Sequence, residues 1–208
     1  MNIKEFENIR WGKNIQRESF RHFSCLNLIK NGPVLDVGCG DGWLLNALKS
    51  KSIICEGVDL SDVAVKKCLS QGLSVTTCNI DGTLPYKDNF FEYVVLLDVL
   101  EHNYNPEALL LEAKRVSKKY VIVSVPNFSS FPARIQVMFG KVPENNKLGK
   151  GHIFWFNHEA LLNVIEKSKL SIIKKVSNTF WPFSKLFPYI SRIFPGLFAL
   201  SFVVLLKK

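Results

Sequence analysis

The stretch VLDVGCGDGWLL, residues 34–45, decides the fold expected for this chain. Its first four residues are an apolar run around Asp36 that indicates a buried strand, and the residues from Trp43 onward indicate the start of a helix. Three glycines stand at alternate positions between them, namely Gly38, Gly40 and Gly42. Because glycine has no side chain to block an approach, this strand-to-helix turn can bring a ligand against the backbone.

Two phosphate-binding patterns fail at this turn. A dinucleotide fingerprint needs its third glycine where this chain has Trp43, and a phosphate loop needs a Lys followed by Ser or Thr after the last glycine. The remaining pattern is D-x-G-x-G-x-G, beginning at Asp36, which combines an open backbone with a carboxylate. It favours a ligand that carries a positive charge or an amine, such as a sulfonium amino acid. The alternative is a tight connection that binds nothing.

Strand and helix patterns alternate along the chain. The predicted strands are 33–37, 53–58, 73–78, 91–97, 119–125, 170–176 and 199–206. The predicted helices are 13–30, 43–50, 61–70, 105–117 and 157–168, with capping signals at Ser61 and Asn157. This order predicts an α/β fold, a Rossmann-like and mostly parallel sheet with helices on both faces.

Polar residues follow several of these strands. Asp59 ends the second strand, seventeen residues after Gly42, where its carboxylate can accept hydrogen bonds from both hydroxyls of a ribose; the alternative is a cap for the helix that begins near Ser61. The third and fourth strands lead to two further pairs, Asn79 with Ile80 and Leu97 with Asp98. Since open α/β sheets bind ligands at the carboxyl ends of their strands, we expect one crevice there.

Composition restricts the class of protein. The 208 residues suit a single domain, and the net charge of +9 is compatible with nucleic acid, an anionic membrane or an acidic substrate, or simply with scattered solvated lysines. Five cysteines form no C-x-x-C pair and have no His at metal-ligand spacing. The charged amino terminus does not resemble a secretory signal. We therefore expect a cytoplasmic protein with reduced thiols and no metal site.

Three segments lie outside the regular alternation. Residues 1–31 form a predicted N-terminal helical extension, and residues 126–157 form a long irregular insert that we interpret as a lid over the site. Residues 180–198 are rich in Phe and Leu. The longest charge-free run, Ile193 to Leu206, has fourteen residues, fewer than a membrane span needs.

The chain resembles a class I S-adenosylmethionine-dependent methyltransferase. The resemblance rests on VLDVGCGDG, GVDLS, LPYKDNFFEYVVLLDVLEH and VIVSVPN, and is strong over residues 30–125. It implies a seven-stranded sheet with a reversed last strand, here FALSFVVLLKK, and S-adenosylmethionine as cofactor.

The resemblance also assigns roles to individual residues. Asp36 and the turn of Gly38, Cys39, Gly40 and Gly42 would hold the methionine part, and Asp59 with Leu60 the ribose. Asn79 and Ile80 stand where the family recognises adenine; Asn79 replaces a common Asp, but its carbonyl oxygen can accept from the adenine amino group. Leu97 and Asp98 would line the cofactor near the methyl donor.

Methyl transfer from a sulfonium needs few dedicated groups, because positioning and exclusion of water supply much of the catalysis. His102 is the best candidate for a general base, and His152 in the insert could reach the acceptor from the other side. The alternatives are a structural hydrogen bond for His102 and aromatic packing for His152. The insert is basic through Arg134, Lys141, Lys147 and Lys150, which could meet an anionic acceptor or form a solvated lid surface.

The acceptor is expected to be a small molecule or a lipid-linked compound. No amino-methylating (N/D)-P-P-(Y/F) signature follows the fourth strand, so nucleic acid is not expected. Aromatic and basic residues alternate in the 180–198 segment, Trp181, Phe183, Lys185, Phe187, Arg192, Phe194 and Phe198. They suit peripheral contact with the inner membrane face, or a hydrophobic lid or dimer surface.

A second resemblance sets the alternative function. VSVPNFSSFPARIQVMFGKVP and GHIFWFN are similar to methionine biosynthesis protein W, which is associated with homoserine acyltransferase. The alternative is therefore a non-catalytic cofactor-binding accessory protein that partners an acyltransferase. DVLEH resembles the small-molecule methyltransferases more closely, and this favours an active enzyme.

Overall fold

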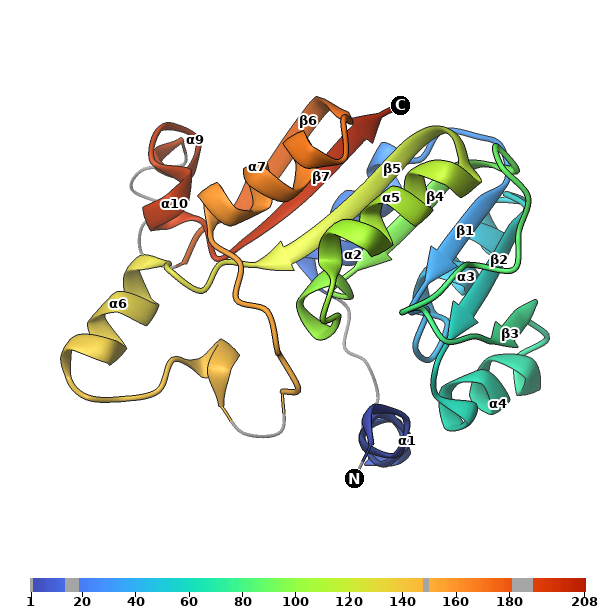
Figure 1. Cartoon of the computed structure of the whole chain (residues 1–208), viewed down its shortest axis with the longest axis horizontal. Helices are drawn as coiled ribbons and strands as arrows, with labels where there is room; N and C mark the ends of the chain where they lie inside the picture. The colour runs from blue at the N-terminus through green and yellow to red at the C-terminus, as the bar shows by residue number, and fades with distance from the viewer. Residues whose placement is uncertain (1, 14–18, 148–149, 181–188) are drawn as a thin grey trace.

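A computed structural model describes residues 2–13, 19–147, 150–180 and 189–208 (Figure 1). Its centre is a seven-stranded sheet. The strands are β1 Val34–Val37, β2 Cys55–Asp59, β3 Val75–Thr77, β4 Phe91–Leu97, β5 Ser117–Pro126, β6 Ser171–Asn178 and β7 Ser201–Lys207. Their order across the sheet is β3-β2-β1-β4-β5-β7-β6. Only the pairs made by β7 are antiparallel, so the seven-stranded sheet with a reversed last strand is confirmed.

Burial explains why the central strands read as continuous apolar runs. All four residues of β1 are buried, and β4 is buried apart from Glu92 and Leu97. Strands covered on both faces have no solvent side to carry alternating polar residues. The edge strand β6 is instead largely exposed and carries Lys174 and Lys175, which discourage pairing with another chain.

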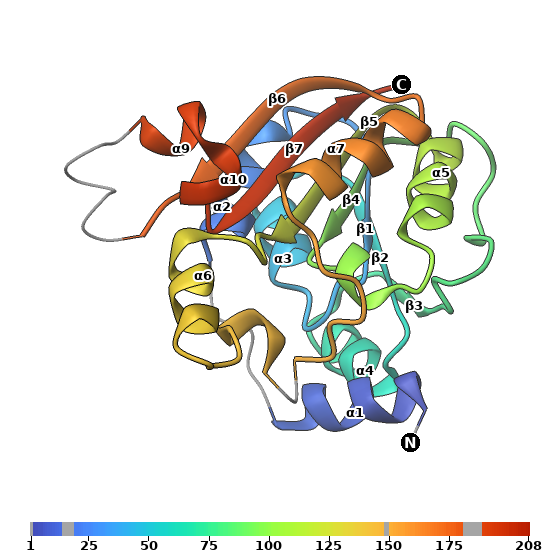
Figure 2. The ribbon, with the colours of Figure 1, turned by 60° about the vertical axis from the view of Figure 1, so that its left-hand side comes forward.

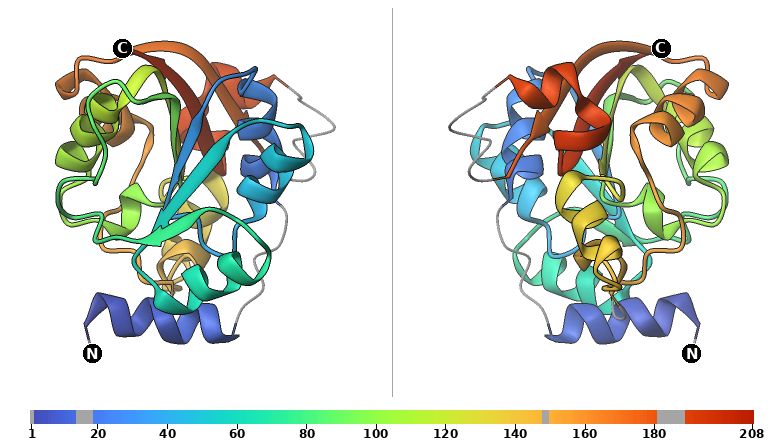
Figure 3. Two further views of the ribbon diagram at one scale, coloured as in Figure 1. Left: turned by 90° about the vertical axis from the view of Figure 1, so that its right-hand side faces the viewer. Right: turned by 90° about the vertical axis from the view of Figure 1, so that its left-hand side faces the viewer.

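Helices cover both faces of the sheet (Figure 3). The main ones are α2 Phe20–Leu28, α3 Trp43–Ser50, α4 Asp62–Ser70, α5 Pro106–Val116 and α7 His158–Lys167. Leucines of α5 and α7 share a core cluster with β4, β5 and β7, whereas α2 and α3 pack with β1 on the opposite face. α4 packs beside α3 through a smaller cluster.

Predicted caps begin two of these helices. The Ser61 hydroxyl accepts a hydrogen bond from the Ala64 N–H at 3.3 Å, and the Asn157 amide oxygen accepts from the Ala160 N–H at 2.7 Å. Each cap satisfies a backbone donor that the first helical turn leaves unpaired.

The amino terminus differs from the prediction of one helix over 13–30. The helical extension predicted over residues 1–31 contains two helices instead: α1 (Ile3–Lys13) lies almost entirely before the predicted helix, and α2 begins only at Phe20, after Ser19 in extended backbone. α1 buries none of its residues, so no apolar stripe marked it in the sequence. It lies across the carboxyl edge of the parallel strands (Figure 2). Residues 14–18 lie outside the described part of the chain.

The insert is more regular than expected. It contains α6 (Phe131–Met138) and the single turn η2 (Glu144–Asn146). Pro132 lies in the first turn of α6, where a proline is tolerated because its missing N–H would have no partner there.

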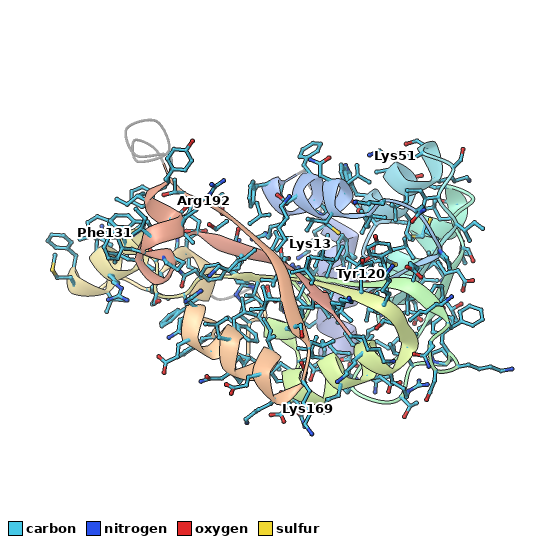
Figure 4. All side chains as sticks on the ribbon, turned by 90° about the horizontal axis from the view of Figure 1, so that it is seen from above. Lys13, Lys51, Tyr120, Phe131, Lys169 and Arg192 are labelled. Carbon is cyan, nitrogen blue, oxygen red and sulfur yellow. The ribbon has the colours of Figure 1, made fainter. Side chains whose placement is uncertain are left out.

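The segment before β7 is only partly described. α9 (Ile190–Ile193) and α10 (Pro195–Phe198) are short helices beside α6, and Phe131 stacks on Phe198 with ring centroids 6.1 Å apart (Figure 4). Trp181, Phe183, Lys185 and Phe187 fall in 181–188, outside the described residues. Among the helices that are described, none is long and apolar enough to cross a membrane.

Candidate functional site

The glycine turn has the backbone conformation that its sequence predicted. Gly38, Gly40 and Gly42 have φ angles of +74°, +56° and +81°, in the left-handed region. A Cβ at Gly38 would lie 2.6 Å from Val99 Cγ2, so the turn also has no room for a side chain at this position. Sterics and conformation therefore both require glycine here.

Asp59 fastens this turn to the end of β2. Its Oδ2 accepts a hydrogen bond from the Gly40 N–H and its Oδ1 accepts one from the Ser61 N–H, both at 2.8 Å. The side chain thus supports the start of α4, as the alternative interpretation expected, and it also lines the cavity described next. Burial raises the pKa of this carboxyl, and the two backbone donors oppose that rise.

Asp36 lies deeper, in β1. Only 3% of the residue is exposed. Burial and the nearby charge of Asp59 raise its pKa to about 7. Because two ionised carboxylates beneath one glycine turn repel each other, a cationic ligand would favour the ionised form of Asp36.

A cavity of about 310 Å³ opens at the carboxyl edge of the sheet. Its sheet side is formed by predicted residues, Gly38, Asp59, Leu60, Ile80, Leu97, Asp98 and His102. Its other side is formed by α1 and by the start of α2, which contribute Glu7, Arg10, Trp11 and Arg21. The cavity is thus closed by a helix of the predicted N-terminal extension, whose position over the site the sequence did not indicate.

The wall does not include every predicted residue. Asp36, Cys39, Gly40, Gly42, Asn79 and His152 are absent from it. Asn79 is exposed, and its Oδ1 accepts from the Asp81 N–H at 3.0 Å, so it shapes a turn that presents Asp81 to the cavity. Asp36 and the other turn residues lie behind the wall, where they set its shape and charge.

Arg21 is the cation that the sequence analysis missed. Its Nη2 lies 2.6 Å from Asp98 Oδ2, and its Nε is buried without a hydrogen-bond partner among the described residues. An unpaired guanidinium donor beside a cavity suits an anionic ligand group such as a carboxylate. An arginine in a predicted amphipathic helix carries no motif, so only the fold could place it here.

Asp98 is held in a constrained geometry. Its φ is +56°, which is uncommon for a residue with a side chain, and its Oδ1 accepts from the Ser124 hydroxyl at 2.7 Å. The ion pair with Arg21 fixes the other oxygen. Such strain is found where a side chain must be aimed at a ligand.

His102 and His152 come together although fifty residues separate them. Their ring centroids are 4.8 Å apart, edge to face. The His102 Nδ1 lies 3.0 Å from the Gly151 carbonyl oxygen, which can only accept, so Nδ1 donates. Burial lowers the pKa of His102 to about 3, so its ring is neutral and weakly basic.

Comparison with known proteins assigns the family. The family described as "Methionine biosynthesis protein MetW" matches residues 17–175, which is most of the chain. The chain belongs to the MetW family. Its seven-stranded sheet with the reversed last strand is that of the class I S-adenosylmethionine-dependent methyltransferases.

Curated relatives of this MetW family member match over part of their length. An uncharacterized protein of Methanocaldococcus jannaschii is 31% identical over 57% of this chain and 53% of its own length. The bifunctional methionine biosynthesis protein MetXA/MetW of Rhodopirellula baltica is 32% identical over 51% of this chain and 19% of its own. A ubiquinone biosynthesis O-methyltransferase of Coxiella burnetii is 34% identical over 39% of this chain and 37% of its own length. The chain therefore spans about half, or less, of the length of these relatives.

Solved structures share the fold of this MetW family member at low identity. A SAM-dependent methyltransferase of Thermotoga maritima, a possible histamine N-methyltransferase, superposes with a TM-score of 0.68 at 23% identity, covering 91% of this chain and 90% of its own. Magnesium protoporphyrin IX methyltransferase of Synechocystis, with bound SAH, superposes with a TM-score of 0.70 at 15% identity. The match covers 100% of this chain and 95% of that protein.

Proposed function

We propose that this chain binds S-adenosylmethionine in the cavity at the carboxyl edge and transfers its methyl group to a small-molecule or lipid-linked acceptor. The observation that carries the proposal is the meeting of three features in one cavity. These are the open glycine turn, the carboxylate of Asp59 and the unpaired Nε of Arg21. A ligand with a cationic sulfur, a ribose and a carboxylate matches all three.

The residues present suit each part of this cofactor. Arg21 would hold the methionine carboxylate, and the negative potential of Asp59 and Asp98 would favour the sulfonium. The remaining lone pairs of Asp59 would accept from the ribose hydroxyls. Ile80 and Asp81 would meet the adenine, with Asp81 taking the place that the sequence assigned to Asn79.

Methyl transfer is an in-line displacement. The acceptor atom attacks the methyl carbon, the carbon–sulfur bond breaks, and its electron pair stays on the neutral sulfur. The chain contributes alignment of the two reactants and exclusion of water, to which α1 adds by forming one side of the cavity. His102 and His152 are the side chains that we assign to the acceptor's proton, although the lowered pKa of His102 makes it a weak base alone.

The acceptor would enter beside the 126–157 insert. A second cavity of about 390 Å³ shares Ser19 and Arg21 with the first and continues toward Pro132, Gln136 and Glu144 of the insert. This position supports the role of the insert as a lid over the acceptor.

A lipid-linked acceptor would also explain an apolar surface. Exposed apolar side chains lie at the end of α6 and in the insert beyond it, and on α9 and the residues that flank it, namely Val137, Met138, Phe139, Val142, Trp155, Tyr189, Ile193 and Phe194. We call this set the apolar end. Arg192 belongs to α9 (Figure 4), and Lys141 lies between Phe139 and Val142 in the sequence. Aromatic anchors mixed with cations are typical of peripheral membrane contact.

Calorimetric titration of S-adenosylhomocysteine tests the cofactor proposal. Wild-type protein is expected to bind one equivalent, and R21A is expected to bind at least tenfold more weakly, because about 1.5–3 kcal/mol is lost with a charged hydrogen bond. R192A is the matched control, since Arg192 rests on the Tyr189 ring away from the cavity. No binding by the wild type, or equal loss in both variants, would contradict the proposal.

A non-catalytic accessory role is the second candidate. The Rhodopirellula baltica relative joins MetXA and MetW in one chain, which supports an acyltransferase as partner. The apolar end would then be a contact surface. Cofactor binding without methyl transfer to any extract fraction, together with a stable complex with a homoserine acyltransferase, would favour this role over the enzyme.

A further inference from the structure

The side chains of Glu101, His102 and His152 form a cluster, of which the proposed function uses the two histidines and leaves Glu101 without a role. One ligand atom from each residue lies within 4.8 Å of the others. Glu101 and His102 belong to the turn η1 (Leu100–His102) after β4, and His152 comes from the returning arm of the insert. The spacing of these residues in the sequence could not reveal the cluster, because only the fold brings the turn after β4 and the insert together.

Backbone hydrogen bonds hold the two segments together. The Glu101 carbonyl oxygen accepts from the N–H groups of Ile153 and Phe154 at 2.9 and 3.0 Å. The His102 Nδ1 donates to the Gly151 carbonyl oxygen. The cluster is therefore built on fixed backbone, not on a chance meeting of mobile side chains.

Glu101 is a buried carboxylate that lacks a close counter-charge. It is 1% exposed, its Oε2 has no hydrogen-bond partner among the described residues, and its Oε1 lies 4.0 Å from His152 Nε2. Asp98 adds negative charge nearby, and Arg21 and Arg10 only partly offset it. An isolated buried carboxylate is costly unless a cation accompanies it.

His102 has the tautomer that a metal requires. Because its Nδ1 carries the proton, the neutral ring presents the lone pair of Nε2. A hydrogen bond from the far nitrogen to a backbone carbonyl is the usual support of a metal-binding histidine. Two imidazoles and one carboxylate are a ligand set for Zn²⁺ or a similar divalent transition metal, with a position left for another oxygen.

We propose that Glu101, His102 and His152 bind a divalent transition-metal ion, with Zn²⁺ the favoured ion, beside the cofactor cavity that His102 lines. Resting on the proposed function, the open position of the ion would take a hydroxyl oxygen of the acceptor, which makes this an O-methylation. The bound hydroxyl loses its proton to water, and its oxygen attacks the methyl carbon as the carbon–sulfur bond breaks. A metal-bound oxygen is far more acidic than a free one, so the acceptor hydroxyl would need no strong base beside it.

Metal titration of the untagged full chain tests the site. Calorimetry with Zn²⁺ is expected to give one equivalent, with affinity reduced at least about tenfold in E101Q and H152A, since even supporting residues of metal sites have effects of this size. H158A is the matched control, because His158 lies at the start of α7 against the Phe202 ring, outside the cluster. Unchanged affinity in E101Q and H152A would overturn the proposal.

Co²⁺ substitution gives a readout that needs no variant. The wild type is expected to show a visible d–d spectrum distinct from that of aqueous Co²⁺ and to lack a sulfur-to-cobalt charge-transfer band. A spectrum like that of the free ion, or a thiolate band from the five cysteines, would contradict the site.

S-Adenosylhomocysteine binding separates the two proposals. The metal-free protein is expected to keep its affinity for this ligand, while loss of the ion abolishes methyl transfer. Metal binding without cofactor binding would refute the methyltransferase proposal and leave the metal site standing. Cofactor binding without metal binding would refute the metal site and leave the methyltransferase proposal standing.

Discussion

Gly38 has a backbone that other residues tolerate poorly. In G38A the φ of +74° would be strained, and the new Cβ would press on Val99 at 2.6 Å. We expect a loss of about 2–4 kcal/mol in the free energy of unfolding, combining about 1–2 kcal/mol for the left-handed backbone with overpacking, and loss of cofactor binding. Urea unfolding measures it. G82A is the control, because Gly82 has open space around it; equal destabilisation in both variants would refute the role of the turn.

Asp36 gives the protein a pH dependence of stability. Its pKa of about 7 in the folded state exceeds the ordinary value of about 3.9. The unfolded chain releases the proton of this carboxyl near pH 4, whereas the folded protein holds it until about pH 7. The free energy of unfolding therefore falls as pH rises from about 4 to about 7. D36N removes this group, and we expect its slope to be less steep by up to about 1.4 kcal/mol per pH unit.

Denaturant unfolding at several pH values compares the two proteins. Asp59 contributes in the same direction, because its own pKa is raised by burial, so D36N should retain some of the fall. Identical slopes in wild type and D36N would show that Asp36 is already ionised in the folded protein.

At the scale of elements, α1 is held over the cavity by few contacts. The Asn8 side chain accepts from the Ser61 hydroxyl at 2.7 Å, and Lys4 pairs with Asp62 at 2.9 Å. In N8A we expect faster amide exchange in α1 and cofactor affinity about fivefold weaker, since one hydrogen bond contributes about 1 kcal/mol. Hydrogen exchange and calorimetry measure these effects.

N46A controls for the loss of a surface asparagine. Asn46 on α3 donates to the Gln71 side chain away from the cavity, so cofactor affinity should stay at the wild-type value. Unchanged α1 exchange in N8A would mean that the helix is held by other contacts, such as that of Phe6 over Gly151.

The elements also show what a sequence can predict. All seven strands and the helix caps at Ser61 and Asn157 were predictable, because burial on both faces and helix capping leave local signals. α6 was not predictable, since it opens with Phe131 and Pro132, and the helical extension predicted over residues 1–31 did not separate α1 from α2, since α1 buries no residue. α1 and α6 both border the cavities, where ligand access replaces core packing as the constraint.

At the scale of the whole molecule, the strand ends of the site were predictable and its other side was not. Gly38, Asp59, Leu60 and Asp98 follow strands at fixed positions, so the topology of a parallel sheet brings them together. Arg21 and the cluster of Glu101 with His152 depend on how distant segments pack, and such contacts leave no periodic signal.

The net charge and the apolar end together predict binding of the molecule to an anionic lipid membrane. The chain carries a formal +9, and Phe139 and Phe194 are 70% and 58% exposed at one end. If this end meets lipid, the wild type should co-sediment with anionic vesicles, and added salt should weaken binding by screening the charge. F139S and F194S together should reduce the bound fraction severalfold, since each removes an apolar anchor.

F90S is the control for that experiment, because Phe90 is 51% exposed but stacks with Tyr86 before β4, outside the apolar end. The double variant should keep its affinity for S-adenosylhomocysteine, because neither phenylalanine lines the cofactor cavity. Equal binding of all three proteins would assign vesicle attraction to net charge alone. Absence of vesicle binding, with loss of an acyltransferase complex in the double variant, would instead make the apolar end a protein contact and favour the accessory role.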